Sequence, residues 1–267
     1  MKLPDLSTLT AFSLLIAVFF IVITGRYLLV AGIFYFVFYK WFPQKWKERK
    51  INKRNYPGGQ FLTEIKWSLI SSFIFAVAGA ITVLWWQKGF TKVYTEVSVA
   101  DIWYMPLSLA MYMMLQETYY YWIHRWMHRP RIFKLVHKVH HDSHIASPFT
   151  AFSFHPLEAI LQAIFIPVLL CIIPIHLYVI VVLLVIMSIS SVINHLDIEI
   201  YPMQKARLFT RWVIGASHHA QHHKQYKYNY GLYFTFWDRF KHTESPTFPG
   251  IFGNKPPTEE SRTLKVK

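Results

Sequence analysis

The sequence is poor in charged residues and in cysteine, and both shortages limit the classes of protein it can belong to. Charged residues make up 16% of the 267 residues, against roughly 25% in soluble domains. Acidic residues are the scarcer kind, with 14 Asp and Glu against 28 Lys and Arg. The one cysteine, Cys171, allows no disulfide within the chain and no iron–sulfur cluster held by cysteines. These shortages exclude a disulfide scaffold and argue against an ordinary soluble domain.

What the sequence has in excess is apolar surface, and it comes in long runs. Hydrophobic residues make up 54% of the chain and aromatic residues 18%. The runs cover residues 9–42, 67–86, 105–123 and 159–195. Because about 20 helical residues cross the hydrocarbon core of a bilayer, each run is long enough for at least one membrane span. The composition therefore predicts an all-α, polytopic membrane protein with about four to six spans.

Two of the runs are too long for a simple span. The run 159–195 contains Pro167 and Pro174, so we expect a helical hairpin that turns near residues 174–176. The run 9–42 could form one long tilted helix or two short helices that break near Gly25 and Arg26. A membrane anchor is favoured here over a secretory signal peptide, because Lys2 alone supplies a charged start and no A-x-A-like site follows.

The basic residues are concentrated in three polar segments. Of the 28 Lys and Arg, eight lie in 40–66, five in 124–144 and eleven in 203–267, while the loop 87–101 holds two. Since Lys and Arg collect in cytoplasmic loops, the three segments are expected on the cytoplasmic side. The net charge of +14 is then explained by topology and attraction to lipid headgroups, or by docking of an acidic electron-transfer partner, and not by nucleic-acid binding.

Eight histidines form three boxes within these polar segments. His124 and His128 have H-x3-H spacing, and two further boxes have H-x2-H-H spacing. The members of the latter are His137, His140 and His141, and then His219, His222 and His223. Residues four apart share one face of a helix, so each box can direct its rings to one place, with adjacent histidines turned towards neighbouring metals.

Such a set of imidazoles predicts two metal ions, because one four-coordinate ion needs only about four ligands. Imidazole binds iron, zinc, copper and nickel, so the residues alone do not identify the metal. His195, at the end of the last apolar run, is favoured as a further ligand over an interfacial histidine. His155 is either a ligand or a neighbour of the ligands. We therefore expect a histidine-rich helical cap on the cytosolic side of the membrane.

Carboxylates are scarce near the boxes. Metal-bound histidines usually donate their other ring proton to a carboxylate or a carbonyl. Five acidic residues lie close enough in sequence to a histidine to accept it, and at least two of them are expected to do so. The five are Glu117, Asp142, Glu158, Asp197 and Glu199.

With its boxes in this order, the chain resembles the fatty acid hydroxylase and sterol desaturase superfamily of membrane oxidoreductases, over residues 111–243. The resemblance rests on the three boxes, on Phe154-His155-Pro156-Leu157-Glu158, on Asn194-His195, on Asn229-Tyr230-Gly231 and on Trp237-Asp238-Arg239. The last two segments look most like the sterol desaturase branch. Where related hydroxylases carry a histidine pair after the last membrane helix, this sequence has His195 and Glu199, so either Glu199 or His155 could complete the coordination.

The resemblance implies a centre of two Fe ions that uses dioxygen to hydroxylate or desaturate a lipid such as a sterol, a fatty acyl chain or a related isoprenoid. The catalytic domain would span 105–245, between an N-terminal membrane region, 1–104, and a tail, 246–267. The sequence has no G-x-G-x-x-G motif and no fused b-type cytochrome. Electrons are therefore expected from a separate b-type cytochrome, ferredoxin or reductase. The expected location is the bacterial inner membrane or the endoplasmic reticulum, with the active site facing the cytoplasm.

Two other classes compete with an enzyme. A membrane transporter or sensor for zinc or iron would also need histidines, but transporters place their ligands near the middle of the bilayer. A non-catalytic scaffold would be expected to have lost part of the boxes, and all three are intact.

Overall fold

The computed structural model describes residues 5–99, 101–201 and 211–246, and in this part of the chain it is almost wholly helical. The N-terminal half contains α1 (Leu9–Tyr35), η1 (Phe36–Trp41), α2 (Pro43–Trp46), η2 (Lys47–Arg49), α3 (Gln60–Gln87) and β1 (Val93–Tyr94). The next elements are α4 (Asp101–Met127), α5 (Pro130–Ile132), η3 (Phe133–His137), α6 (Lys138–His141) and η4 (Pro148–Phe152). They are followed by α7 (Pro156–Ile172), β2 (Ile175–His176), α8 (Leu177–Asn194), α10 (Ala216–Gln225) and α11 (Phe236–Phe240). The predicted all-α class is confirmed.

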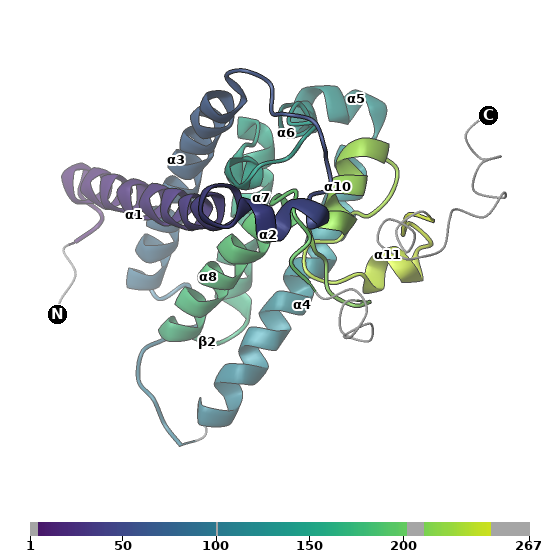
Figure 1. Ribbon diagram of the computed structural model, residues 1–267. Helices are drawn as coiled ribbons and strands as arrows, with labels where there is room; N and C mark the ends of the chain where they lie inside the picture. The colour runs from purple at the N-terminus through teal and green to yellow at the C-terminus, as the bar shows by residue number, and fades with distance from the viewer. Residues whose placement is uncertain (1–4, 100, 202–210, 247–267) are drawn as a thin grey trace.

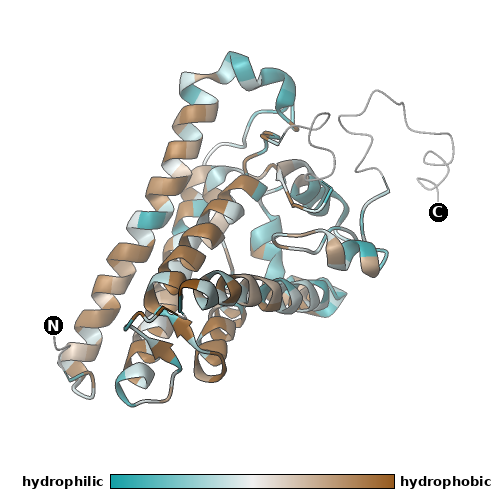
Figure 2. Cartoon of the chain, turned by 90° about the horizontal axis from the view of Figure 1, so that it is seen from below, coloured by the Kyte–Doolittle hydropathy of each residue, from teal (hydrophilic) through white to brown (hydrophobic). Residues whose placement is uncertain are grey.

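Three of the described helices are long and apolar enough to cross a membrane: Leu9–Trp41, Gln60–Gln87 and Leu177–Asn194. The first run is thus a single helix, because α1 continues without a break at Gly25 into the π-helix η1. Apolar residues cover most of α1, and the chain becomes hydrophilic where it leaves this helix (Figure 2). The chain is therefore a membrane protein. The expected four to six spans would also require α4, which carries polar side chains, and the shorter apolar helix α7 to enter the membrane.

The predicted hairpin is confirmed, with α7 ending at Ile172 and α8 starting at Leu177. Between them β2 pairs in parallel with β1, in the register Val93 to Ile175 and Tyr94 to His176. Apolar side chains of α4, α7 and α8 pack together next to this turn, around Tyr112, Leu170 and Leu183. A second apolar cluster joins α1, η4 and α8. The helices therefore form a packed framework.

The polar segments gather at one end of this framework. Figure 1 shows α5, α6 and α10 at one end of the helices and β2 at the other. The segment after α1 also lies at the polar end, because Ile51 N donates to Asp197 O at 2.9 Å and Glu199 N donates to Arg49 O at 3.1 Å. The described parts of the three basic segments thus share one end. Residues 203–210 and 247–267 lie outside the described residues, and the second range includes all of the predicted tail, 246–267, except residue 246.

Candidate metal centre

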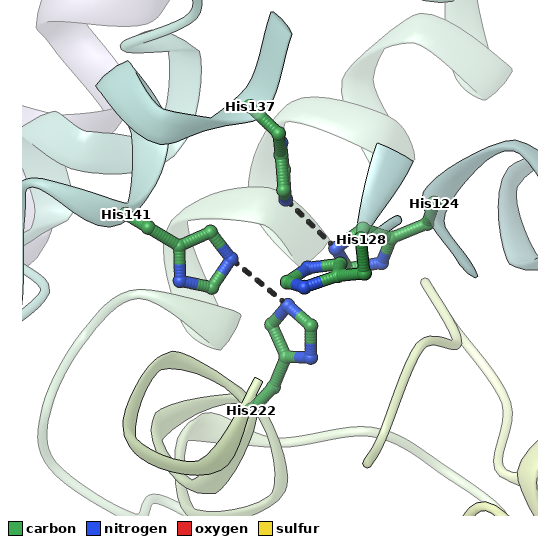
Figure 3. Close-up of side chains that lie close together, drawn as sticks. All are labelled: His124, His128, His137, His141 and His222. Atoms are coloured by element: carbon green, nitrogen blue, oxygen red, sulfur yellow. Dashed lines mark hydrogen bonds between the residues drawn. The ribbon is translucent and has the colours of Figure 1, made fainter. Parts of the chain in front are cut away.

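Nine of the predicted histidines lie in two groups at the polar end of the helices. Within each group the ring nitrogens that could bind an ion lie within 4.8 Å of one another. Group one contains His124, His128, His137, His141 and His222, whose rings point toward one another from different segments (Figure 3). Group two contains His140, His195, His219 and His223. Every box and the end of α8 therefore contribute to a common centre.

The spacing within each box decides which group a histidine joins. Histidines four residues apart join the same group, as His124 and His128, His137 and His141, and His219 and His223 do. The remaining member of each H-x2-H-H box joins the other group, which separates His140 from His141 and His222 from His223. This follows from about 100° of rotation per helical residue. Adjacent histidines of a box thus turn to different groups.

Hydrogen bonds at Nδ1 fix the direction of four rings. The Nδ1 atoms of His124, His140, His195 and His222 lie 2.7–3.2 Å from the carbonyl oxygens of Tyr230, Ser153, Ser191 and Tyr228, respectively. Because a carbonyl oxygen only accepts hydrogen bonds, each of these Nδ1 atoms carries the ring proton and each Nε2 carries a lone pair. A fifth ring, His137, has its Nδ1 atom 2.9 Å from the buried carboxyl group of Glu158.

Ring nitrogens face each other at short range in both groups. His124 Nε2 lies 3.1 Å from His137 Nε2 in group one, and His140 Nε2 lies 3.1 Å from His195 Nε2 in group two. In the group-two pair both atoms carry lone pairs, so the two nitrogens repel each other unless a cation binds both. Nitrogens bound at right angles to one ion, each at about 2.1 Å, are separated by about 3 Å. The residues present therefore fit one metal ion in each group.

Burial excludes protonation as the other way to relieve this repulsion. Loss of hydration lowers the pKa of His195 to about 4 and holds the pKa of His140 well below its ordinary value, with further lowering by the neighbouring His195. Burial likewise depresses the pKa values of His137, His141, His219, His222 and His223. The rings are thus neutral at physiological pH, which is the form that binds metals. The two histidine groups can hold metal ions.

Of the five carboxylates predicted to support the ligands, one contacts a histidine in the described chain. Glu158 is fully buried against His137. Asp142 is exposed and pairs with Lys138 at 2.7 Å. Asp197 accepts from the Asn52 backbone at 3.2 Å and also from its side chain. No second carboxylate contacts a ligand histidine among the described residues. Backbone carbonyls instead accept hydrogen bonds from the rings of His124, His140, His195 and His222.

Glu199 and His155, the two candidates for completing the coordination, are outside both groups. Glu199 accepts from Ser217 N at 2.9 Å, so its negative charge lies at the N-terminus of α10, where a helix favours an anion. His155 Nδ1 accepts from Leu157 N at 3.3 Å and caps the start of α7. Both residues thus position elements that carry or support ligands.

Glu117 and Asp238 support the centre in a way that the sequence did not predict. The buried carboxylate of Glu117 accepts from the backbone N–H groups of Leu232, Tyr233 and Phe234 at 2.6–3.2 Å. Asp238 accepts from the N–H groups of Tyr230 and Gly231 at 2.8 and 2.9 Å. Together they fix the turn whose Tyr230 carbonyl binds His124. The only signals of this turn in the sequence were the Asn-Tyr-Gly motif at 229–231 and the Trp-Asp-Arg motif at 237–239.

Comparison with known proteins agrees with this site. The fatty acid hydroxylase family profile matches residues 109–243, about half of the chain. Lathosterol oxidase from Rattus norvegicus is 31% identical over 59% of this chain and 54% of its own length. A putative Delta(7)-sterol-C5(6)-desaturase from Arabidopsis thaliana is 34% identical over 57% of this chain and 52% of its own length.

A Delta(7)-sterol 5(6)-desaturase from Leptosphaeria maculans matches a longer stretch, with 28% identity over 80% of this chain and 56% of its own length. The chain thus spans about half the length of the curated relatives it matches. No solved structure matches the chain significantly.

Proposed function

Since the chain belongs to the fatty acid hydroxylase family, and is most similar to its sterol desaturase branch, we propose that it is a membrane di-iron oxidoreductase. It would use dioxygen to hydroxylate or desaturate a lipid. The observation that carries this proposal is the convergence of nine imidazoles in two groups that could each hold a metal ion, with two unprotonated Nε2 atoms facing each other in group two. The names of the relatives favour such an enzyme over a transporter or sensor of metals.

The ligands of the two metals would be the histidines of the two groups, five for one ion and four for the other. His155 and Glu199 would have no direct part in the coordination. When bound, two irons would supply the redox chemistry with dioxygen that no side chain of this protein can supply. We assign these metals as iron from the family, since imidazole alone also suits zinc and copper.

The protein's own residues would hold this centre rigid and keep water away from it. The hydrogen bonds at Nδ1 keep four of the rings turned inward, and the buried Glu158 side chain packs behind His137. Eight of the nine imidazoles are buried, and His128 is partly buried. A dry, preorganised pocket strengthens electrostatic interactions with reacting groups.

A lipid substrate follows from the position of the centre as well as from the relatives. Three of the nine histidines, His124, His128 and His195, lie at the ends of α4 and α8, and α8 is long and apolar enough to cross a membrane. A lipid could therefore reach the centre sideways from the bilayer. The relatives act on sterols, as their names state, and we propose a sterol or a related isoprenoid as the substrate class, with a fatty acyl chain as the alternative.

Two electrons per turnover would come from a separate b-type cytochrome, ferredoxin or reductase. The basic surface at the polar end suits an acidic partner. We also propose that this end faces the cytoplasm, in a bacterial inner membrane or the endoplasmic reticulum, because basic segments stay on that side. The catalytic domain would be residues 105–245, and 1–104 would anchor it.

Lipid analysis tests the proposal most directly. Cells that express the chain should gain a lipid that is heavier by one oxygen or lighter by two hydrogens, as measured by mass spectrometry, and a His140→Ala variant should not produce it. The purified protein should turn over only when an electron donor is added. Sustained turnover with NAD(P)H alone would contradict the separate donor, and an unchanged lipid profile across candidate hosts would contradict the enzyme.

A further inference from the structure

A second site lies apart from the histidine groups, in a cavity of about 550 Å³ where η1 ends and α3 begins. Its wall includes three tyrosines, Tyr35, Tyr39 and Tyr56, and two lysines, Lys40 and Lys50. None of the residues that line it is acidic. The cavity therefore combines aromatic walls with positive charge.

The two lysines are available to a ligand. Lys50 Nζ lies 5.5 Å from the centre of the Tyr56 ring and 5.9 Å from that of Tyr39, and Lys40 Nζ lies 5.7 Å from the Tyr35 ring. Such contacts hold an ammonium group loosely over a ring face. The ion pairs of the described chain involve neither lysine. The positive charge of Lys50 acts against the burial that raises the pKa of Asp197. The Asp197 carboxylate already accepts hydrogen bonds from Asn52.

The cavity also lies at the level of a membrane interface. One helix that is long and apolar enough to cross a membrane ends at Trp41 and another begins at Gln60, and the lining includes residues from the end of the first and the start of the second. Trp41 is 66% exposed and Leu62 is 76% exposed, as expected for side chains that contact lipid. Aromatic residues are enriched at the headgroup level of membranes, and lysines near it attract anionic lipids.

We propose that this cavity binds the phosphodiester headgroup of an anionic membrane phospholipid, with Lys40 and Lys50 paired to the phosphate. Lysine binds phosphate as a compact point charge. Two such charges without an acidic neighbour in the lining favour a headgroup with net negative charge over a zwitterionic one. The tyrosine rings and Leu62 would contact the glycerol and the upper acyl chain.

The wall of the cavity is bonded to the segment that follows His195, so a bound lipid should stabilise the protein. The Tyr56 hydroxyl donates to the Tyr39 hydroxyl at 2.9 Å, and the Tyr39 hydroxyl donates to the Leu196 carbonyl. Leu196 directly follows the group-two histidine His195. Lipid binding can be measured on the full chain without metal or turnover, so this inference does not depend on the proposed function.

The test is native mass spectrometry of the full chain in a neutral detergent, titrated with phosphatidylglycerol or phosphatidylcholine. Phosphatidylglycerol should bind about tenfold more tightly. The double variant Lys40→Gln/Lys50→Gln should weaken its binding by about 25-fold, since each lysine near a lipid phosphate is worth about fivefold. The control Lys45→Gln/Lys47→Gln removes equal charge from the adjacent short helices α2 and η2, outside the lining, and should change the affinity by less than about twofold.

Three results would overturn the inference: equal binding of the two lipids, equal losses in the two double variants, or complete displacement of phosphatidylglycerol by millimolar inorganic phosphate. The third would indicate a site for a soluble phosphate. Thermal melting without lipid checks that both double variants fold. If the lining variant melts early, Lys40→Arg/Lys50→Arg restores the charges and should restore phosphatidylglycerol binding.

Discussion

Single side chains behind the ligands decide how the imidazoles are oriented, and Glu158 is the only carboxylate among the described residues that contacts one of them. Glu158→Gln replaces the carboxyl group behind His137 Nδ1 with an amide while keeping the shape of the side chain. Loss of such a partner typically weakens metal binding about 10–100-fold. We expect this loss in a metal competition assay. Asp142→Asn, at an exposed ion pair, is the control and should bind metal as the unaltered protein does.

Gly231 shows how tightly the turn 229–234 is built around the centre. A Cβ atom at this residue would lie 2.6 Å from the Phe234 carbonyl oxygen and 3.0 Å from Glu117 Oε1. The backbone would have to shift, at a cost of about 1–3 kcal/mol in the free energy of unfolding. Gly231→Ala should therefore lower the melting temperature, whereas Gly25→Ala, with open space around it, should not. Equal melting temperatures would contradict the close packing of this turn.

At the scale of elements, α3 holds the segment that follows the second histidine box. The buried Glu64 carboxylate accepts from the hydroxyl groups of Ser143 and Thr150 at 2.7 and 2.9 Å, and from Ser147 at 2.5 Å. Glu64→Ala leaves these buried donors without their acceptor. We expect a loss of about 3 kcal/mol in the free energy of unfolding. Glu48→Ala, in the short helix η2 and exposed, should change it by less than about 0.5 kcal/mol.

The elements that a regular pattern specifies were predictable, and those fixed by distant contacts were not. The apolar runs predicted the hairpin near residues 174–176, and the spacing of the boxes predicted that adjacent histidines turn to neighbouring sites. The roles of Glu117, His155 and Glu199 were missed, because each bonds to backbone N–H groups and not to a ligand. Which N–H groups remain unpaired depends on how helices end and turns fold, and residue types alone do not show it.

For the whole molecule, the two groups join four parts of the chain, so metal should stabilise the fold. A ligand that binds only the folded state at 1,000 times its dissociation constant adds about 4 kcal/mol. For a chain of this size that raises the melting temperature by roughly 10 °C. Removal of metal by a chelator should lower the melting temperature by about that amount, and added Fe²⁺ should restore it. In His140→Ala the chelator should have a smaller effect. No effect on the unaltered protein would mean that the centre does not link these parts.

The number of metal ions bound per chain tests the two-metal centre most directly. The measurement is elemental analysis of the full chain after reconstitution with Fe²⁺ under anaerobic conditions and removal of loosely bound metal. Two groups of converging ring nitrogens predict two iron atoms per chain, and one fewer when His195→Ala disrupts group two. A value near zero, or a value of one that His195→Ala leaves unchanged, would contradict a separate ion in each group.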